Sequence, residues 1–111
     1  MTDAVIVFVT VPSRDEGDRL ADALVGEQLA ACVNIVGPIR SIYRWQGEIC
    51  RDDEHLLLIK TTRPRYAALE ARVQALHPYE VPEIIAVPIG AGSAGYLAWI
   101  RSMTAGRDAP P

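Results

Sequence analysis

The sequence is poor in the residues that mark several common protein classes. Its 111 residues include two cysteines, Cys32 and Cys50, and one lysine, Lys60. Two thiols in apolar-flanked stretches build no disulfide scaffold and indicate a reducing compartment. The longest apolar runs are too short to span a bilayer, and Asp3 interrupts the first, so we expect neither a membrane span nor a secretory leader. The prediction is one domain, residues 1–111, in the cytoplasm.

Positive charge is also scarce. The formal net charge is −3, and the basic residues are scattered along the chain. Proteins that bind nucleic acids need a basic face to contact phosphates, so we expect no nucleic-acid partner. Half of the residues are hydrophobic, and a small domain this apolar often shares part of its surface with copies of itself. The composition therefore favours an oligomer.

The first third of the chain predicts a strand and then a helix. Residues Ala4–Val11 form an apolar run rich in β-branched residues, which is typical of a central strand. Ser13 and Glu16 have the spacing of a capping box, which predicts a helix start. Leu20 and Leu24 follow four residues apart and give that helix an apolar stripe.

A long hairpin is predicted next. Residues Ala31–Val36 and Ile39–Trp45 have the pattern of one strand broken at Gly37-Pro38, where proline cannot donate to a sheet and so marks a bulge or an edge. Gln46-Gly47 is a turn signal, and Glu48–Thr61 is the returning strand. A hairpin this long projects beyond a domain of this size, so its far end is expected to pair with something else.

The rest of the chain predicts a second helix, a strand and a short last helix. Pro64 suits the first turn of the second helix, and Pro78 ends it. Ile84–Ile89 is the strand, and residues 105–111 are expected to fray. The last helix carries an apolar face of Tyr96, Trp99, Ile100 and Met103. The resulting order, βαββαβ plus a C-terminal helix, is an α+β fold of the ferredoxin-like type.

Several stretches, in the right order and at the right spacing, resemble the CutA divalent-cation-tolerance family. The resemblance runs from about Val5 to Ser102. The segments His-Pro-Tyr-x-x-Pro-Glu and Tyr-x-Trp-x-Gly are its most specific parts. The matching stretches are Ala30–Ile35, Tyr43–Ile49, Lys60–Thr62, His77–Ile84 and Tyr96–Ile100.

This resemblance implies a homotrimer assembled like the PII signalling proteins, with the long hairpins pairing across subunits. It also implies a binding and assembly protein, not an enzyme, that associates with divalent cations such as copper and needs none for folding. Some members carry a cysteine and a histidine where this chain has Val9 and Leu76. Among the family's metal-associated positions, His77 is therefore the remaining candidate ligand.

His77 has a second interpretation. A histidine at the end of a helix can interact with the helix dipole and cap its carbonyl groups without binding any ligand. The acidic run Asp52–Glu54 beside His55 is likewise open to two interpretations, a cation cluster or a solvated hairpin face. Because adjacent strand residues point to opposite faces, the sequence favours the solvated face.

Five further residues are predicted to line an intersubunit cleft or interface. Tyr43 and Trp45 lie two apart on one strand face and can pack across a subunit boundary. The other three are polar residues in apolar or proline-rich surroundings, Lys60, Tyr79 and Glu83, which would satisfy a boundary network or line a cleft.

Three other functions remain open from the sequence. A PII-like regulatory trimer binding a small metabolite at intersubunit clefts is the main alternative. An RNA-binding module shares this topology but needs stacking aromatic residues on its central strands, where Phe8 stands alone. An enzyme needs an acid–base pair or nucleophile, and His77 with Glu80 or Glu83 is the nearest combination.

Overall fold

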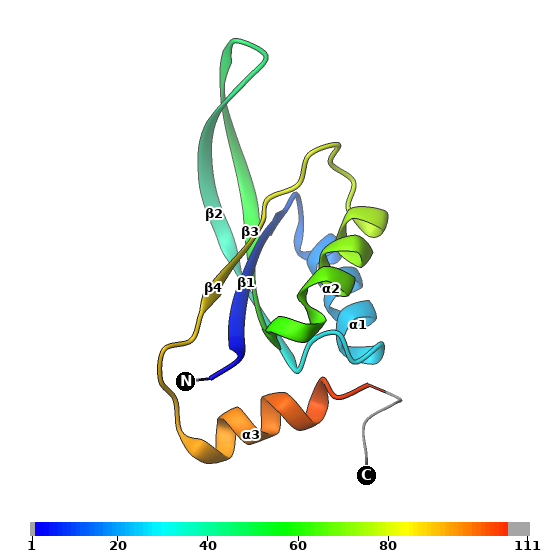
Figure 1. Ribbon diagram of the computed structural model, residues 1–111. Helices are drawn as coiled ribbons and strands as arrows, with labels where there is room; N and C mark the ends of the chain where they lie inside the picture. Colours follow the sequence, from blue (N-terminus) through cyan, green and yellow to red (C-terminus); the bar gives the residue numbers. More distant parts are fainter. Residues whose placement is uncertain (1, 107–111) are drawn as a thin grey trace.

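A computed structural model describes residues 2–106, and Figure 1 shows its seven elements. The predicted order of strands and helices, βαββαβ plus a C-terminal helix, is confirmed. The frayed tail predicted for 105–111 falls mostly on residues 107–111, which lie outside the described residues. The elements are β1 Ala4–Val11, α1 Arg14–Gly26, β2 Cys32–Trp45, β3 Glu48–Thr62, α2 Arg63–Leu76, β4 Ile84–Pro88 and α3 Ala94–Met103.

The four strands form one antiparallel sheet in the order β2-β3-β1-β4. Helices α1 and α2 lie together on one face, and α3 lies across one end (Figure 1). Alternate β1 residues point into the core between sheet and helices, as the period of two in a strand requires. The fully buried core side chains include Val7, Val9 and Val11 of β1, Leu57 and Ile59 of β3, and Leu20, Leu24, Leu69 and Val73 of the helices.

The helix starts follow from local chemistry. Ser13 Oγ accepts a hydrogen bond from the backbone N–H of Glu16 at 3.2 Å, which caps the first turn of α1 as the spacing predicted. Helix α2 has Pro64 in its first turn, where the missing N–H is not needed, and His77 at its C-cap.

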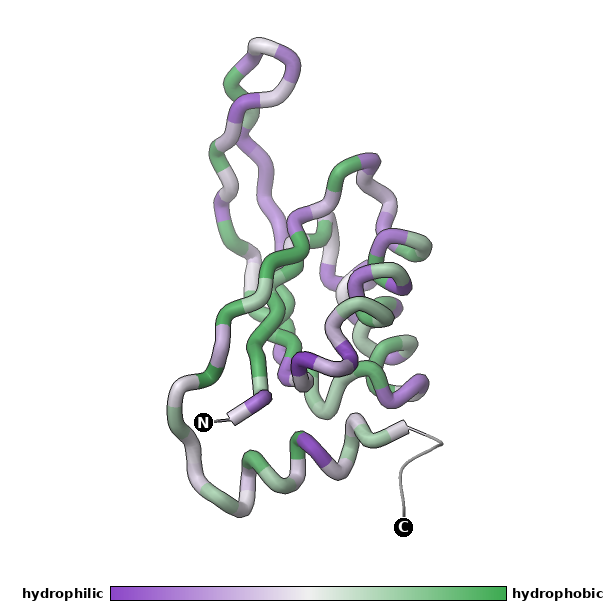
Figure 2. Tube along the Cα trace, viewed as in Figure 1, coloured by the Kyte–Doolittle hydropathy of each residue, from purple (hydrophilic) through white to green (hydrophobic). Residues whose placement is uncertain are grey.

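The other face of the sheet has no helix layer over it. The residues between the core positions, Ile6 and Phe8 of β1 and Leu58 of β3, point to this side because strand side chains alternate. Ile85 and Val87 pair with β1 on the same side and are 54% and 43% exposed. Figure 2 shows hydrophobic colour along β1 and β4. We call this surface, Ile6, Phe8, Leu58, Ile85 and Val87, the open sheet face.

The hairpin of β2 and β3 projects well beyond the helices (Figure 1). Its length makes the molecule elongated, with extents of 49 × 26 × 21 Å. Ile42 and Ile49 near its tip are 63% and 55% exposed. The tip therefore carries apolar side chains that the chain itself does not cover.

The irregularity predicted at Gly37-Pro38 is confirmed: β2 runs through this cis peptide as an edge strand, with a register shift between Val36 and Ile39. One local expectation needs correction. In α3, Ile100 is buried against Ala4 and Ala31, but the other three predicted face residues are 40–44% exposed, because the helix contacts only the end of the sheet. Cys32 and Cys50 are half-buried free thiols on the two strands of the hairpin.

Candidate functional site

A cavity of about 670 Å³ lies between the distal half of the hairpin and the loop that joins α2 to β4. Its size is in the range of small-molecule sites. The wall combines three aromatic rings, from Tyr43, Trp45 and Tyr79, with three carboxylates, from Glu54, Glu80 and Glu83. None of the residues that line it is basic.

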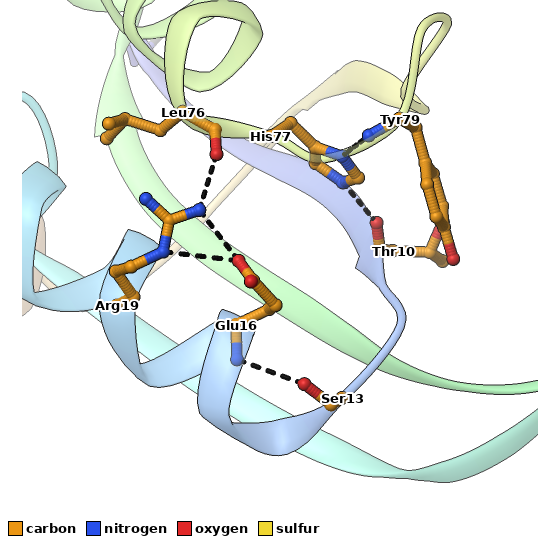
Figure 3. A network of polar contacts seen from close by, with 7 residues as sticks. All are labelled: Thr10, Ser13, Glu16, Arg19, Leu76, His77 and Tyr79. Carbon is orange, nitrogen blue, oxygen red and sulfur yellow. Dashed lines mark hydrogen bonds and ion pairs between the residues drawn. The ribbon is translucent and has the colours of Figure 1, made fainter.

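The loop over the cavity is fixed by His77. This side chain is 7% exposed, and its Nε2 lies 2.7 Å from the carbonyl oxygen of Thr10, to which it donates (Figure 3). Its Nδ1 accepts a hydrogen bond from the backbone N–H of Tyr79 at 3.0 Å. Because both ring nitrogens are bonded, His77 ties the loop to the end of β1.

The end of α2 that carries His77 is itself anchored to α1. Arg19 donates to the carbonyl oxygen of Leu76, the residue before His77, and to the carboxylate of Glu16 (Figure 3). The pair with Glu16 is a charged contact of 2.7 Å. The capped first turn of α1 therefore helps to place the loop.

Glu54 is the most buried acidic residue at the site. It is 6% exposed, and its Oε2 accepts a hydrogen bond from the Tyr79 hydroxyl at 2.7 Å. The solvated hairpin face that we predicted for this acidic run is therefore wrong for Glu54. It lies on the same strand side as Leu56 and Leu58, and the α2–β4 loop covers it there.

The carboxylates of the cavity act on one another. Burial and the nearby charge of Glu54 raise the pKa of Glu83 above its ordinary value. Burial and the hydrogen bond to Glu54 likewise raise the pKa of Tyr79. A hydrogen bond from Tyr43 to Asp52 raises the pKa of Tyr43 to about 12. At neutral pH the hydroxyls of Tyr43 and Tyr79 are therefore protonated and donate hydrogen bonds. The negative charge of the carboxylates that line the cavity is not balanced by a basic residue in its wall.

Four of the five predicted interface residues lie together. Tyr43, Trp45, Tyr79 and Glu83 all line the cavity. Lys60 does not, because its ammonium bonds Asn34 on the neighbouring strand. Six residues of β3 separate it from Glu54, roughly 20 Å along an extended strand. The role of all five between subunits stays a prediction.

The residues of one chain do not fit a copper centre. Within residues 2–106, no three His, Cys, Asp or Glu side chains come close enough together to hold a metal ion. A borderline metal such as copper needs several nitrogen or sulfur donors. His77 would have to break one of its two hydrogen bonds to become one. Val9, in the position where some relatives carry a ligand, is fully buried in the core.

None of the helices in the described part of the chain is long and apolar enough to cross a membrane.

Comparisons with known proteins agree with this fold. The family profile described as "CutA1 divalent ion tolerance protein" matches residues 5–103. The divalent-cation tolerance protein CutA of Thermus thermophilus is 56% identical over 99 residues, which cover 89% of this chain and 96% of that protein. The chloroplastic protein CutA of Arabidopsis thaliana is 48% identical over 91% of this chain but only 56% of its own length.

Solved structures show the same architecture. The Thermus thermophilus protein superposes with a TM-score of 0.89 at 54% identity, covering 91% of this chain and 98% of that one. CutA from Xylella fastidiosa superposes with a TM-score of 0.91 at 41% identity, covering 93% and 99%. On its sequence and its fold, this chain belongs to the CutA1 divalent ion tolerance protein family.

Proposed function

We propose that this chain works as a homotrimeric binding protein in the response to divalent cations, copper above all. The observation that carries the proposal is the open sheet face. Its apolar side chains lie on the two central strands and on β4, where a monomer would leave them in water. Burying such a surface against other copies is the usual solution for a small domain.

The hairpin supports the same assembly. Strand β2 is an edge of the sheet, and its outer backbone groups are free to pair with another strand. The exposed apolar residues near the tip, Ile42 and Ile49, would be covered by the same pairing. Each copy would then extend the sheet of its neighbour.

The cation role rests on the family's description and takes His77 as the candidate ligand. Since residues 2–106 bring no group of three metal donors together, copper binding at His77 requires donors from another copy or a rearranged loop. A trimer offers the first of these routes, because the resemblance implies that the long hairpins of neighbouring copies pair across subunits.

Calorimetric titration of the full chain with Cu²⁺ tests this role. Stoichiometric binding that His77→Gln abolishes and His55→Gln preserves would make His77 a ligand. The chain has only these two histidines, so His55 is a matched control. Binding that is absent, or that both variants retain, would refute the assignment. Circular dichroism of each variant checks that the fold is intact.

A second candidate function is favoured by the cavity itself. A trimer of the PII type that senses a small metabolite would use a mixed aromatic and polar pocket of this size. In either case we propose binding without catalysis. We also propose a cytoplasmic location, although relatives are described as chloroplastic or periplasmic.

A further inference from the structure

The charge of the cavity wall restricts what it can bind. Three carboxylates face it and no basic residue does. The pKa of Glu83 is raised because protein atoms and the charge of Glu54 disfavour its ionised form. An anionic ligand would add to this repulsion, whereas a cationic ligand would relieve it.

The carboxylate of Glu54 has one oxygen that can accept a hydrogen bond from a ligand. Glu54 is more than nine-tenths buried, and only its Oε2 is bonded, to Tyr79. No hydrogen bond to its Oε1 occurs within residues 2–106, although Glu54 lines the cavity. Because this second oxygen is not among the buried unpartnered atoms, it is open to the cavity, and a charged donor placed there can form a hydrogen bond with it.

The shape and the rings of the cavity argue for an extended organic cation over a metal ion. The carboxylates do not gather into a group that could hold a metal. A volume of about 670 Å³ is far larger than a point ion needs. Tyr43 and Trp45, 42% and 44% exposed, offer ring faces that attract ammonium and guanidinium groups.

We propose that the cavity binds a small organic cation, an aliphatic amine or guanidine, through Glu54 and Glu83 and the faces of the aromatic rings. One cationic group lies against Glu54 Oε1, and the aliphatic part packs against Tyr43 and Tyr79. This inference rests on the second function proposed above, small-ligand binding, and does not depend on copper.

The test compares putrescine with 1,4-butanediol, which has the same length and no charge. Binding is followed by calorimetry on the unmodified chain, at about 0.15 M salt, which screens the attraction of the net charge. We expect saturable binding of putrescine and none of the diol.

Three charge variants locate the binding. Glu54→Gln keeps an oxygen that can accept from Tyr79 but removes the charge, and we expect putrescine to bind roughly 10-fold or more weakly. Glu83→Gln, at a largely exposed position, gives a second variant that does not disturb a buried group. Asp53→Asn is the control, because it removes the same charge from the residue next to Glu54. The Asp53 side chain points to the opposite face of the strand, and 73% of it is exposed.

Several results would overturn the proposal. Equal binding of the diol, or no binding of putrescine, would show that charge recognition is absent. Putrescine binding that Asp53→Asn weakens as much as Glu54→Gln and Glu83→Gln do would reveal a general surface attraction. Light scattering on the same samples distinguishes the failure of this proposal from the failure of the trimer proposal. A monomer that binds putrescine would refute only the trimer. A trimer that does not bind putrescine would refute only the cation site.

Discussion

Replacing Tyr79 by Phe removes one hydroxyl and leaves the ring in place. In the folded protein that hydroxyl donates to the carboxylate of Glu54, a residue that is 6% exposed. Hydrogen bonds to charged groups contribute about 1.5–3 kcal/mol, and a buried carboxylate that loses its donor keeps its desolvation cost. Because Glu54 also lines the cavity, water can reach part of the carboxylate, so we expect Tyr79→Phe to lower the free energy of unfolding by about 1.5–2 kcal/mol.

Urea unfolding followed by circular dichroism measures this loss. Every variant is compared at one protein concentration, because the stability of an oligomer depends on it. Tyr43→Phe is the matched control: it removes a hydroxyl that also bonds a carboxylate, Asp52, but on the exposed surface of the hairpin. At this exposed position water can donate to Asp52 in place of the lost hydroxyl. We therefore expect Tyr43→Phe to lower the free energy of unfolding by clearly less than Tyr79→Phe does.

A cycle with Glu54→Gln checks the cause. If the loss comes from the unpaired charge, Tyr79→Phe is less damaging in the Glu54→Gln protein than in the unmodified one. Equal losses for Tyr79→Phe and Tyr43→Phe would refute the reasoning, because the buried pair would then contribute no more than the exposed one.

The close packing of Gly37 gives a further prediction: an added Cβ would lie 2.6 Å from Cδ2 of His55, so we expect Gly37→Ala to cost about 1–3 kcal/mol in urea unfolding. Gly26→Ala, with no atom within 4 Å of the added Cβ, is its control and should be neutral or slightly stabilising; equal effects of the two would contradict the packing argument. Glu83→Gln tests the repulsion between the carboxylates through its dependence on pH. Folding raises the pKa of Glu83, so the ionised Glu83 lowers the stability of the fold only when the pH rises above 4.5, the ordinary pKa of a glutamate. The variant should therefore melt at a higher temperature than the unmodified chain at pH 7 and at the same temperature at pH 4, and a difference that persists at pH 4 would point to another cause.

The sheet and the helices were predictable because their signals are local. The β-branched run Ala4–Val11 gave the bounds of β1, and Ser13 with Glu16 gave the start of α1. The partial failure was in α3, where Tyr96, Trp99 and Met103 were expected to pack with Ile100. Periodicity shows which residues share a helix face but not how much of that face reaches another element.

The candidate site was predictable only in part, for a related reason. Tyr43, Trp45, Tyr79 and Glu83 were found because their chemistry is unusual for their surroundings. The burial of Glu54 was missed, because it depends on a loop from a distant part of the chain folding over the hairpin. Such a contact has a large sequence separation, 25 residues for the bond to Tyr79, and leaves no periodic pattern.

The measurement that tests the central proposal most directly is the mass of the chain in solution, by light scattering at micromolar concentration. The account predicts three times the 12.1-kDa mass of one chain. It also predicts that Ile85→Asp, on the open sheet face, lowers that mass, whereas Val25→Asp, an exposed apolar position on α1, does not. A mass of 12.1 kDa for the unmodified chain would contradict the assembly and require another explanation for the open sheet face.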